Sequence, residues 1–226
     1  MRIEQLSFKF DAQQRAYFFN NISIAFALHQ LNFITGDNGV GKSTLFSILQ
    51  GHHDVHSYVE GRFLIDGAEC DATMRTQYVH TVQQKYDQMI ADQFTFMQNL
   101  QFANMGRYPG LNRLANATVF PIIEQCAIDM HKPVHLLSGG QRQLLAIVMA
   151  LQKTTRVLLL DEPTATLDAK NAQLIMQCLE VLARELSITI IIICHDRTLM
   201  GRYGTHNQYV MSARCNGERV ITRSNP

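Results

Sequence analysis

One glycine-rich segment constrains the fold of this chain more than any other part of it. Residues 36–44 read GDNGVGKST and match the pattern G-x-x-x-x-G-K-[ST] without a mismatch. Leu31 to Thr35 has the composition of a short apolar strand, and Lys42 to Gln50 that of a helix, with Gly51 well placed to end it. A strand, a glycine loop and a helix in this order bring successive backbone N–H groups around an anion. The segment therefore predicts a phosphate-binding loop in an α/β fold.

The side chains of this loop have separate expected roles. Lys42 would reach the β- and γ-phosphates of a nucleotide, and Ser43 would give its hydroxyl to Mg²⁺. Thr44 would bond the α-phosphate side through its hydroxyl or its N–H. The residues expected to bind the nucleotide from this loop are Gly36, Asn38, Gly39, Gly41, Lys42, Ser43 and Thr44.

Two later apolar strands end in polar residues. Arg156 to Leu160 runs into Asp161, which is placed to act on Mg²⁺, and Glu162 follows at once. At the carboxyl end of a strand, Glu162 can position or deprotonate a water molecule near the γ-phosphate. Ser187 to Cys194 is the second such strand, and His195 follows it at the sheet edge where α/β proteins bind ligands.

Composition and charge narrow the class of protein. The 226 residues include 20 basic and 19 acidic side chains, and this balance gives no reason to expect a nucleic-acid partner. The longest apolar runs, Val157–Leu160 and Ile188–Cys194, are far shorter than the roughly 20 residues of a membrane span. The five cysteines are scattered without a C-x-x-C pair, which indicates free thiols in a reducing compartment. We also expect no signal peptide, because the first residues lack an apolar stretch.

The remaining segments predict how the chain is organised. Ile3–Phe10 and Asn21–Ala27 have the β content of paired strands, and Asn216-Gly217 predicts a hairpin within Gln208–Thr222. From about Lys85 to Leu137 the chain is rich in Met, Gln, Asn and Leu, and its pattern is mostly helical. With no internal repeat, we expect one nucleotide-binding unit with a helical insertion.

A second glycine turn, LSGGQRQ at residues 137–143, lies about a hundred residues after the first. Ser138 is a good N-cap for a helix from Gly139 to Gln152, so the positive end of the helix dipole and free N–H donors face outward. With this turn, the chain resembles the ATP-binding cassette (ABC) ATPases over nearly its whole length, with the motifs in the family's order. The resemblance implies an α/β fold: a P-loop NTPase core of ABC type with an N-terminal antiparallel β subdomain and an inserted helical subdomain. The expected boundaries are one domain over 1–226, with a core at about 1–84 and 153–226 and a helical subdomain at about 85–152.

The resemblance also assigns roles to residues. It implies ATP as the nucleotide, Glu162, His195 and Gln84 as catalytic residues, and Mg²⁺ held by Ser43, Gln84 and Asp161. Gln83 stays open as an alternative to Gln84. Phe10 falls where the family stacks an aromatic ring on adenine. The family's signature motif and D-loop, which contribute to ATP binding, correspond here to Ser138, Gly139, Gly140, Gln141 and Asp168.

In the family, the signature of one subunit caps the ATP held by another. The resemblance therefore implies a dimer with a second copy or a related chain. It also implies separate transmembrane permease subunits at the cytoplasmic membrane face, an importer more than an exporter, and in some systems a solute-binding protein. The segment with Tyr86, Met89, Ile90, Phe94 and Phe96 is a candidate permease-docking surface.

Two other functions compete with this one. A soluble ABC ATPase of DNA repair or translation is disfavoured, because the sequence contains neither a long coiled coil nor a second cassette and its net charge is near zero. A P-loop small-molecule kinase is disfavoured by the signature turn.

Overall fold

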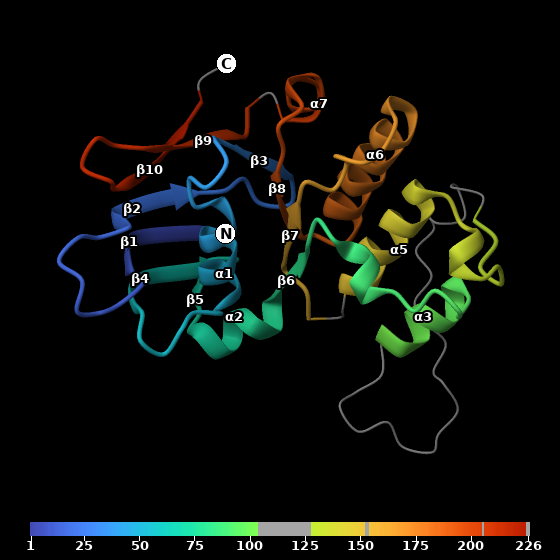
Figure 1. The fold of residues 1–226 in the computed structure, drawn as a ribbon, viewed down its shortest axis with the longest axis horizontal. Coiled ribbons are helices and arrows are strands. Elements are labelled where there is room, and N and C mark those ends of the chain that lie inside the picture. Colours follow the sequence, from blue (N-terminus) through green and yellow to red (C-terminus); the bar gives the residue numbers. More distant parts are fainter. Residues whose placement is uncertain (104–127, 152–153, 205, 225–226) are drawn as a thin grey trace.

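The computed structural model describes residues 1–103, 128–151, 154–204 and 206–224. Ten strands form one sheet in the order β5-β4-β1-β2-β10-β9-β3-β8-β7-β6 (Figure 1). The strands are β1 (Arg2–Lys9), β2 (Phe19–Ala25), β3 (Leu31–Thr35), β4 (Tyr58–Ile65), β5 (Ala68–Glu69), β6 (Val79–Val82), β7 (Val157–Asp161), β8 (Thr189–Ile193), β9 (Gln208–Ala213) and β10 (Arg219–Arg223).

The sheet has an antiparallel part and a parallel part. β1 pairs antiparallel with β2 and β4, whereas β3, β6, β7, β8 and β9 form a parallel ladder. β10 joins the two parts: it pairs antiparallel with β9 and parallel with β2 at a single position. The predicted N-terminal antiparallel strands and the C-terminal hairpin at Asn216-Gly217 are therefore confirmed.

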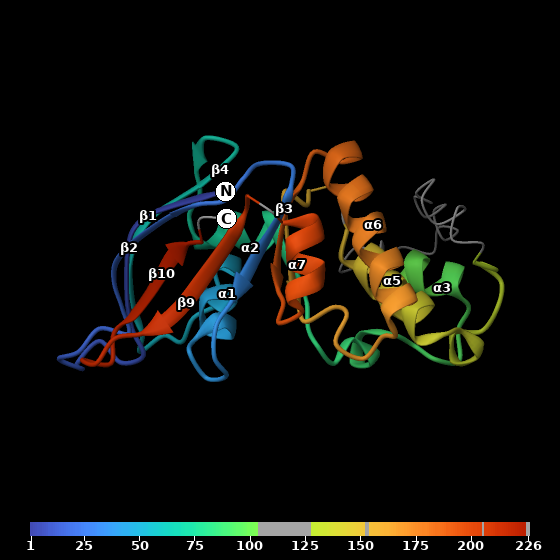
Figure 2. The same ribbon diagram turned by 90° about the horizontal axis from the view of Figure 1, so that it is seen from above.

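Helices cover both faces of the parallel part. They are α1 (Lys42–Gln50), α2 (Ala72–Tyr78), α3 (Phe96–Ala103), α5 (Gly139–Ala150), α6 (Ala169–Glu185) and α7 (Arg197–Tyr203), with short 3-10 turns η1 (Tyr86–Met89) and η2 (Val134–Leu136). In both ribbon views α1 and α2 lie beside the antiparallel strands, whereas α3, α5 and α6 lie beyond β6 and β7 (Figures 1 and 2).

The two faces bury two apolar cores, and the side-chain period of a strand explains their composition. Leu158 and Leu160 of β7 point into the core with α5 and α6, while Val157 and Leu159 point into the core with α1 and the antiparallel strands. A strand covered on both faces needs apolar residues at every position, which is why β7 and β8 read as continuous apolar runs. The ends of these strands are therefore held firmly, and their polar residues lie at one sheet edge.

Most predicted element boundaries agree with the structure to within about two residues. The helix expected after the glycine loop spans Lys42–Gln50, and Gly51 follows it with φ 83°. α2 ends at Tyr78, and the edge strand β6 begins at the next residue, Val79. Two short helices, α2 and α7, were not predicted, because neither carries a long apolar stripe; each begins at an aspartate N-cap.

The predicted helical insertion is described in part. α3, η1 and η2 belong to it, and residues 104–127 lie outside the described residues. Gln152, the expected end of the signature helix, also lies outside them, and α5 is described up to Ala150. No helix among the described residues is long and apolar enough to cross a membrane.

Candidate functional site

The glycine loop between β3 and α1 adopts the backbone that phosphate binding requires. Gly36 has φ 149° and Gly41 has φ 112°. A Cβ at Gly36 would lie 2.3 Å from the carbonyl oxygen of Met211, and one at Gly41 would lie 2.6 Å from the Phe18 ring. Both positions therefore require glycine. No side chain caps the start of α1 at Gly41, so the first N–H groups of this helix can turn to an anion.

Lys42 lies over this loop as the first residue of α1. Its side chain is buried, and Nζ donates to the carbonyl oxygens of Gly36 at 2.7 Å and Asp37 at 3.0 Å. Burial lowers the pKa of Lys42, and the nearby carboxylates, Glu162 foremost, oppose that shift. The loop itself thus holds an ammonium group beside the glycine turn.

The structure brings most of the predicted nucleotide residues into one hollow of about 330 Å³. Its lining combines glycine-loop residues, two carboxylates, one amide and two aromatic rings. The lining residues are Phe10, Phe18, Asn38, Gly39, Gly41, Lys42, Ser43, Thr44, Gln84, Asp161 and Glu162.

The carboxylate part of the hollow is organised around Glu162. This residue has φ 50°, and its backbone N–H donates to the carbonyl oxygen of Ile193 at 3.0 Å. Nε2 of Gln84 donates to one carboxylate oxygen at 3.3 Å, and Nε2 of His195 lies 3.3 Å from the other. Three residues predicted from separate segments therefore meet at one carboxylate. Of Gln83 and Gln84, it is Gln84 that contacts Glu162 and lines the hollow.

The residues expected to hold Mg²⁺ fit that ion. The hydroxyl of Ser43, the amide of Gln84 and the carboxylate of Asp161 line the same hollow, and oxygen atoms are the ligands that Mg²⁺ prefers. Burial raises the pKa of Asp161, and the negative charge of Glu162 adds to that shift. Two neighbouring carboxylates are a setting in which a divalent cation is stabilising.

Two aromatic rings, Phe10 and Phe18, form an aromatic wall of the hollow. Phe10 is 50% exposed, and its ring packs edge to face on Phe18 at 4.8 Å and on Phe8 at 5.0 Å. The ring of Phe10 therefore has two fixed aromatic neighbours and exposed surface left for another ring. Sequence reasoning missed Phe18, although the aromatic run Tyr17-Phe18-Phe19 after the predicted first strand marks the position.

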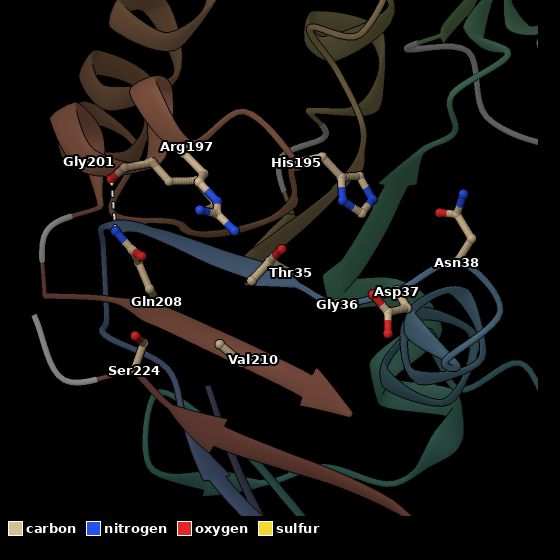
Figure 3. Close-up of a pocket in the computed structure, with 11 residues that line it drawn as sticks. Thr35, Gly36, Asp37, Asn38, His195, Arg197, Gly201, Gln208, Val210 and Ser224 are labelled. Atoms are coloured by element: carbon tan, nitrogen blue, oxygen red, sulfur yellow. Dashed lines mark hydrogen bonds between the residues drawn. The ribbon is translucent and has the colours of Figure 1, made fainter. Parts of the chain in front are cut away.

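A second hollow of about 780 Å³ opens beside the glycine loop (Figure 3). Gly36, Asp37 and Asn38 form one side of it, and His195 and Arg197 lie opposite. Figure 3 shows the His195 imidazole between Arg197 and Asn38, and Asn38 borders both hollows.

The second glycine turn is built differently. Ser138 caps α5 with a capping box: its hydroxyl accepts from the Gln141 N–H at 3.3 Å, and the Gln141 side chain accepts from the Ser138 N–H at 3.0 Å. Gly140 is buried against Asn171, and Asp168 caps α6 by accepting from the Asn171 N–H at 2.9 Å. Among the described residues that line the 330 Å³ hollow, none comes from this turn. Figure 1 shows α5 separated from α1 by the strands β6 and β7.

The predicted permease-docking group is only partly at the surface. Tyr86, Ile90 and Phe96 belong to the core, whereas Met89 is 39% and Phe94 41% exposed. The expectation that all five form a surface is wrong, because η1 and α3 turn their larger apolar side chains toward α5.

Strand order, glycine loop and the carboxylate cluster at the sheet edge define a P-loop nucleotide-binding domain of the ABC ATPase type. The family model described as ABC transporter matches residues 19–165. An energy-coupling factor transporter ATP-binding protein of Clostridium perfringens is 31% identical over all of this chain and 78% of its own length. The chain therefore belongs to the ABC transporter family.

Other relatives and solved structures agree with this placement. An ABC transporter ATP-binding protein of Vibrio vulnificus is 29% identical over 99% of the chain, and the chain spans 39% of that relative's length. CbiO1 from Clostridium perfringens, described as part of the ABC transporter complex CbiONQ, has a TM-score of 0.75 and 26% identity over 98% of this chain and 87% of its own. The cassette MJ0796, solved as a dimer bound to ADP and phosphate, has a TM-score of 0.66 and 23% identity over 98% and 97% of the two chains, and this likeness concerns the fold.

Proposed function

We propose that the chain is the ATP-binding and ATP-hydrolysing subunit of a membrane transporter. The observation that carries the proposal is the meeting of Gln84, His195 and Glu162 beside the hollow lined by the glycine loop. A phosphate chain on Gly39, Gly41 and Lys42 would point its last phosphate toward this carboxylate cluster. Family membership supports the same activity.

In this proposal Glu162 orients the attacking water molecule and accepts its proton. His195 and Gln84 hold the two oxygens of the Glu162 carboxylate, which fixes its direction. Lys42 would leave the Gly36 and Asp37 carbonyls for the phosphate oxygens. Ser43, Asp161 and Gln84 would hold Mg²⁺, which supplies neutralisation of phosphate charge when bound. Phe10 would stack on adenine.

We further propose that two copies pair head to tail, so that Ser138, Gly139, Gly140 and Gln141 of one copy cap the ATP of the other. The separation of α5 from α1 supports this arrangement, because the turn does not line its own chain's hollow. Asp168 lies at the start of α6, next to the same turn through Asn171. A closed pair would bind ATP better than an open one, and hydrolysis would release the contact.

The partner that uses this cycle is proposed to be a separate permease, with the subunit at the cytoplasmic membrane face. The names of the Clostridium relatives support a transport role, and an import direction follows from the resemblance alone. A solute-binding protein would belong to such an importer, and nucleic acid has no place in it. The exposed apolar group of Met89, Phe94, Phe102 and Leu136 offers a docking surface, with Phe94 and Phe102 packed edge to face at 5.0 Å.

Turnover and ATP-dependent pairing test the enzymatic part. The purified chain should hydrolyse ATP with Mg²⁺ and stop when the metal is chelated. Glu162→Gln should bind ATP, lose about 100-fold or more in turnover, and elute as a dimer in size-exclusion chromatography when ATP is present. A Glu162→Gln variant that stays monomeric and turns over normally would overturn the proposal.

Affinity purification from membranes tests the transport part. The chain should recover an integral membrane protein, and Phe94→Ser with Phe102→Ser should lose it while keeping ATP binding. Leu174→Ser is a matched control, since Leu174 is also 40% exposed but lies on α6. Recovery of ribosomes or DNA in place of a membrane protein would favour the soluble alternative.

A further inference from the structure

Arg219 occupies the one position where the two parts of the sheet are joined. It opens β10 and is paired with Phe19 of β2, the single register pair between these strands. Its backbone N–H donates to the carbonyl oxygen of Phe18 at 2.8 Å. The C-terminal hairpin is thus attached to the chain segment that carries the aromatic wall.

The side chain of Arg219 contacts the glycine loop and this wall together. Nε donates to the carbonyl oxygen of Val40 at 3.0 Å. The guanidinium carbon lies 4.7 Å from the centroid of the Phe18 ring, within the range of a cation–π contact. Nη1 donates to the carbonyl oxygen of Gly217, which braces the guanidinium from its own hairpin.

The Val40 contact has a consequence for phosphate binding. In a trans peptide group the C=O and the following N–H point in opposite directions. A Val40 carbonyl held by Arg219 therefore turns the Gly41 N–H away from Arg219. Gly41 lines the nucleotide hollow, so this orientation favours an N–H donor directed at phosphate.

The Phe18 ring contacts both the glycine loop and Phe10. The Phe18 ring lies so close to Gly41 that a Cβ there would be 2.6 Å from it. The same ring supports Phe10 at 4.8 Å, and both rings line the hollow. One arginine on a distant strand thus supports the loop that would hold the phosphates and the wall that would hold the base.

We propose that Arg219 is a positioning residue for nucleotide binding, acting through the Val40–Gly41 peptide and the Phe18 ring. The proposal rests on the proposed ATPase function. Among the described residues, the guanidinium of Arg219 is not engaged by a carboxylate. In this hairpin, it is Arg214 that forms an ion pair with Glu218. Arg219 acts on affinity for ATP and not on the hydrolytic step, because its contacts are to Val40 and the Phe18 ring and not to Glu162.

Steady-state kinetics of Arg219→Gln test this assignment. We expect KM for ATP to rise about five- to tenfold, as lost charge-assisted and cation–π contacts would give, with kcat within about twofold of wild type. Arg219→Lys keeps the charge but loses the planar group that donates and stacks at once, so its KM should rise about two- to threefold. Arg214→Gln is the control: it lies in the same hairpin, pairs with Glu218 at 3.8 Å, and should leave KM unchanged.

A double-mutant cycle with Phe18→Leu separates positioning from general loss of structure. Because both residues act through one contact, the combined variant should raise KM by less than the product of the single effects. An unchanged KM in Arg219→Gln, or a fully multiplicative cycle, would overturn the assignment. If Arg219→Gln fails to fold, Arg219→Lys keeps the β10 pairing and the same KM criterion applies to it. Wild-type protein that neither binds nor hydrolyses ATP would instead defeat the proposed function.

Discussion

Two helices in this molecule begin at glycine turns, and they treat their first N–H groups differently. α1 begins at Gly41 with no side-chain cap, and its open end faces a hollow lined by polar groups. α5 begins at Ser138 with a complete capping box, which uses the Ser138 hydroxyl and the Gln141 side chain within the chain itself. The comparison indicates that the first N–H groups of α1 need a ligand as their hydrogen-bond partner, whereas the start of α5 is already ordered by its own capping box.

The two turns also differ in backbone strain. Gly41 has a positive φ and lies against Phe18. Gly139 has ordinary helical geometry, and a Cβ there would meet Leu167 at an ordinary contact distance of 3.7 Å. Strain concentrates at sites that bind ligands closely. The first turn would then hold the nucleotide of its own chain, and the second would be presented to a partner.

The largest expected effect comes from removing the charge at the first turn. Lys42→Ala deletes the ammonium that lies over the Gly36 and Asp37 carbonyls, so ATP turnover should fall about 100-fold or more. ATPase rate at saturating ATP and a direct nucleotide-binding titration measure it, with a far-UV circular dichroism spectrum to check that the fold is kept. Turnover close to that of wild type would show that Lys42 does not act on the phosphates.

Ser138→Arg should damage hydrolysis by about 100-fold as well, but through the other chain. Binding of ATP by the monomer should stay within about twofold of wild type, because Ser138 does not line its own chain's hollow. The decisive measurement mixes this variant with Lys42→Ala. A mixed dimer has one site with an intact glycine loop and an intact signature, so up to about a quarter of wild-type activity should return if the chains pair at random. A mixture that stays inactive would contradict a site shared between chains.

Features of these turns that depend on neighbouring residues in the sequence could be predicted, and features that depend on distant residues could not. The glycine loop, the capped α5 and Asp161 were predictable, because fixed spacing, N-cap chemistry and apolar strand runs are local signals. The contact between Phe18 and Arg219 was not: it depends on a strand pairing between residues 200 positions apart, which no local pattern encodes.

The prediction that Tyr86, Met89, Ile90, Phe94 and Phe96 form one docking surface was wrong for a related reason. Met89 and Phe94 are exposed while Tyr86, Ile90 and Phe96 are buried, and composition alone does not say which face of a short irregular segment meets the core. Gln84 was favoured over Gln83 by its spacing after the strand, and Gln84 is the one that contacts Glu162.

A matched pair of glycine substitutions tests the difference in strain. Gly41→Ala should cost about 2–3 kcal/mol in the free energy of unfolding, because a Cβ would meet the Phe18 ring in a backbone that L residues rarely adopt. Gly139→Ala should change it by no more than about 0.5–1 kcal/mol, and toward greater stability, because alanine favours the helix. Urea unfolding without nucleotide measures both. Equal losses would show that the two turns are equally strained and would end the comparison.

The smallest expected effect concerns the N-cap of α6. This cap is the carboxylate of Asp168, which can titrate, whereas the Ser138 hydroxyl that caps α5 cannot. Hydrogen bonds from the Asn171 N–H at 2.9 Å and from its side-chain amide at 2.6 Å hold the pKa of Asp168 below its usual range. Because the pKa is lower in the folded chain, the cap contributes stability above the unfolded value near 3.8 and loses it as pH falls through the lower folded value. Asp168→Asn keeps an oxygen for the Asn171 N–H but cannot titrate, so its Tm should fall less than that of wild type between about pH 5.5 and pH 3, by a margin of about 2 °C. The Ser138 hydroxyl does not titrate in this range, so the loss caused by Ser138→Ala should be the same at both pH values. A pH-dependent loss at Ser138 would mean that its capping box is coupled to a charged neighbour and is not self-contained.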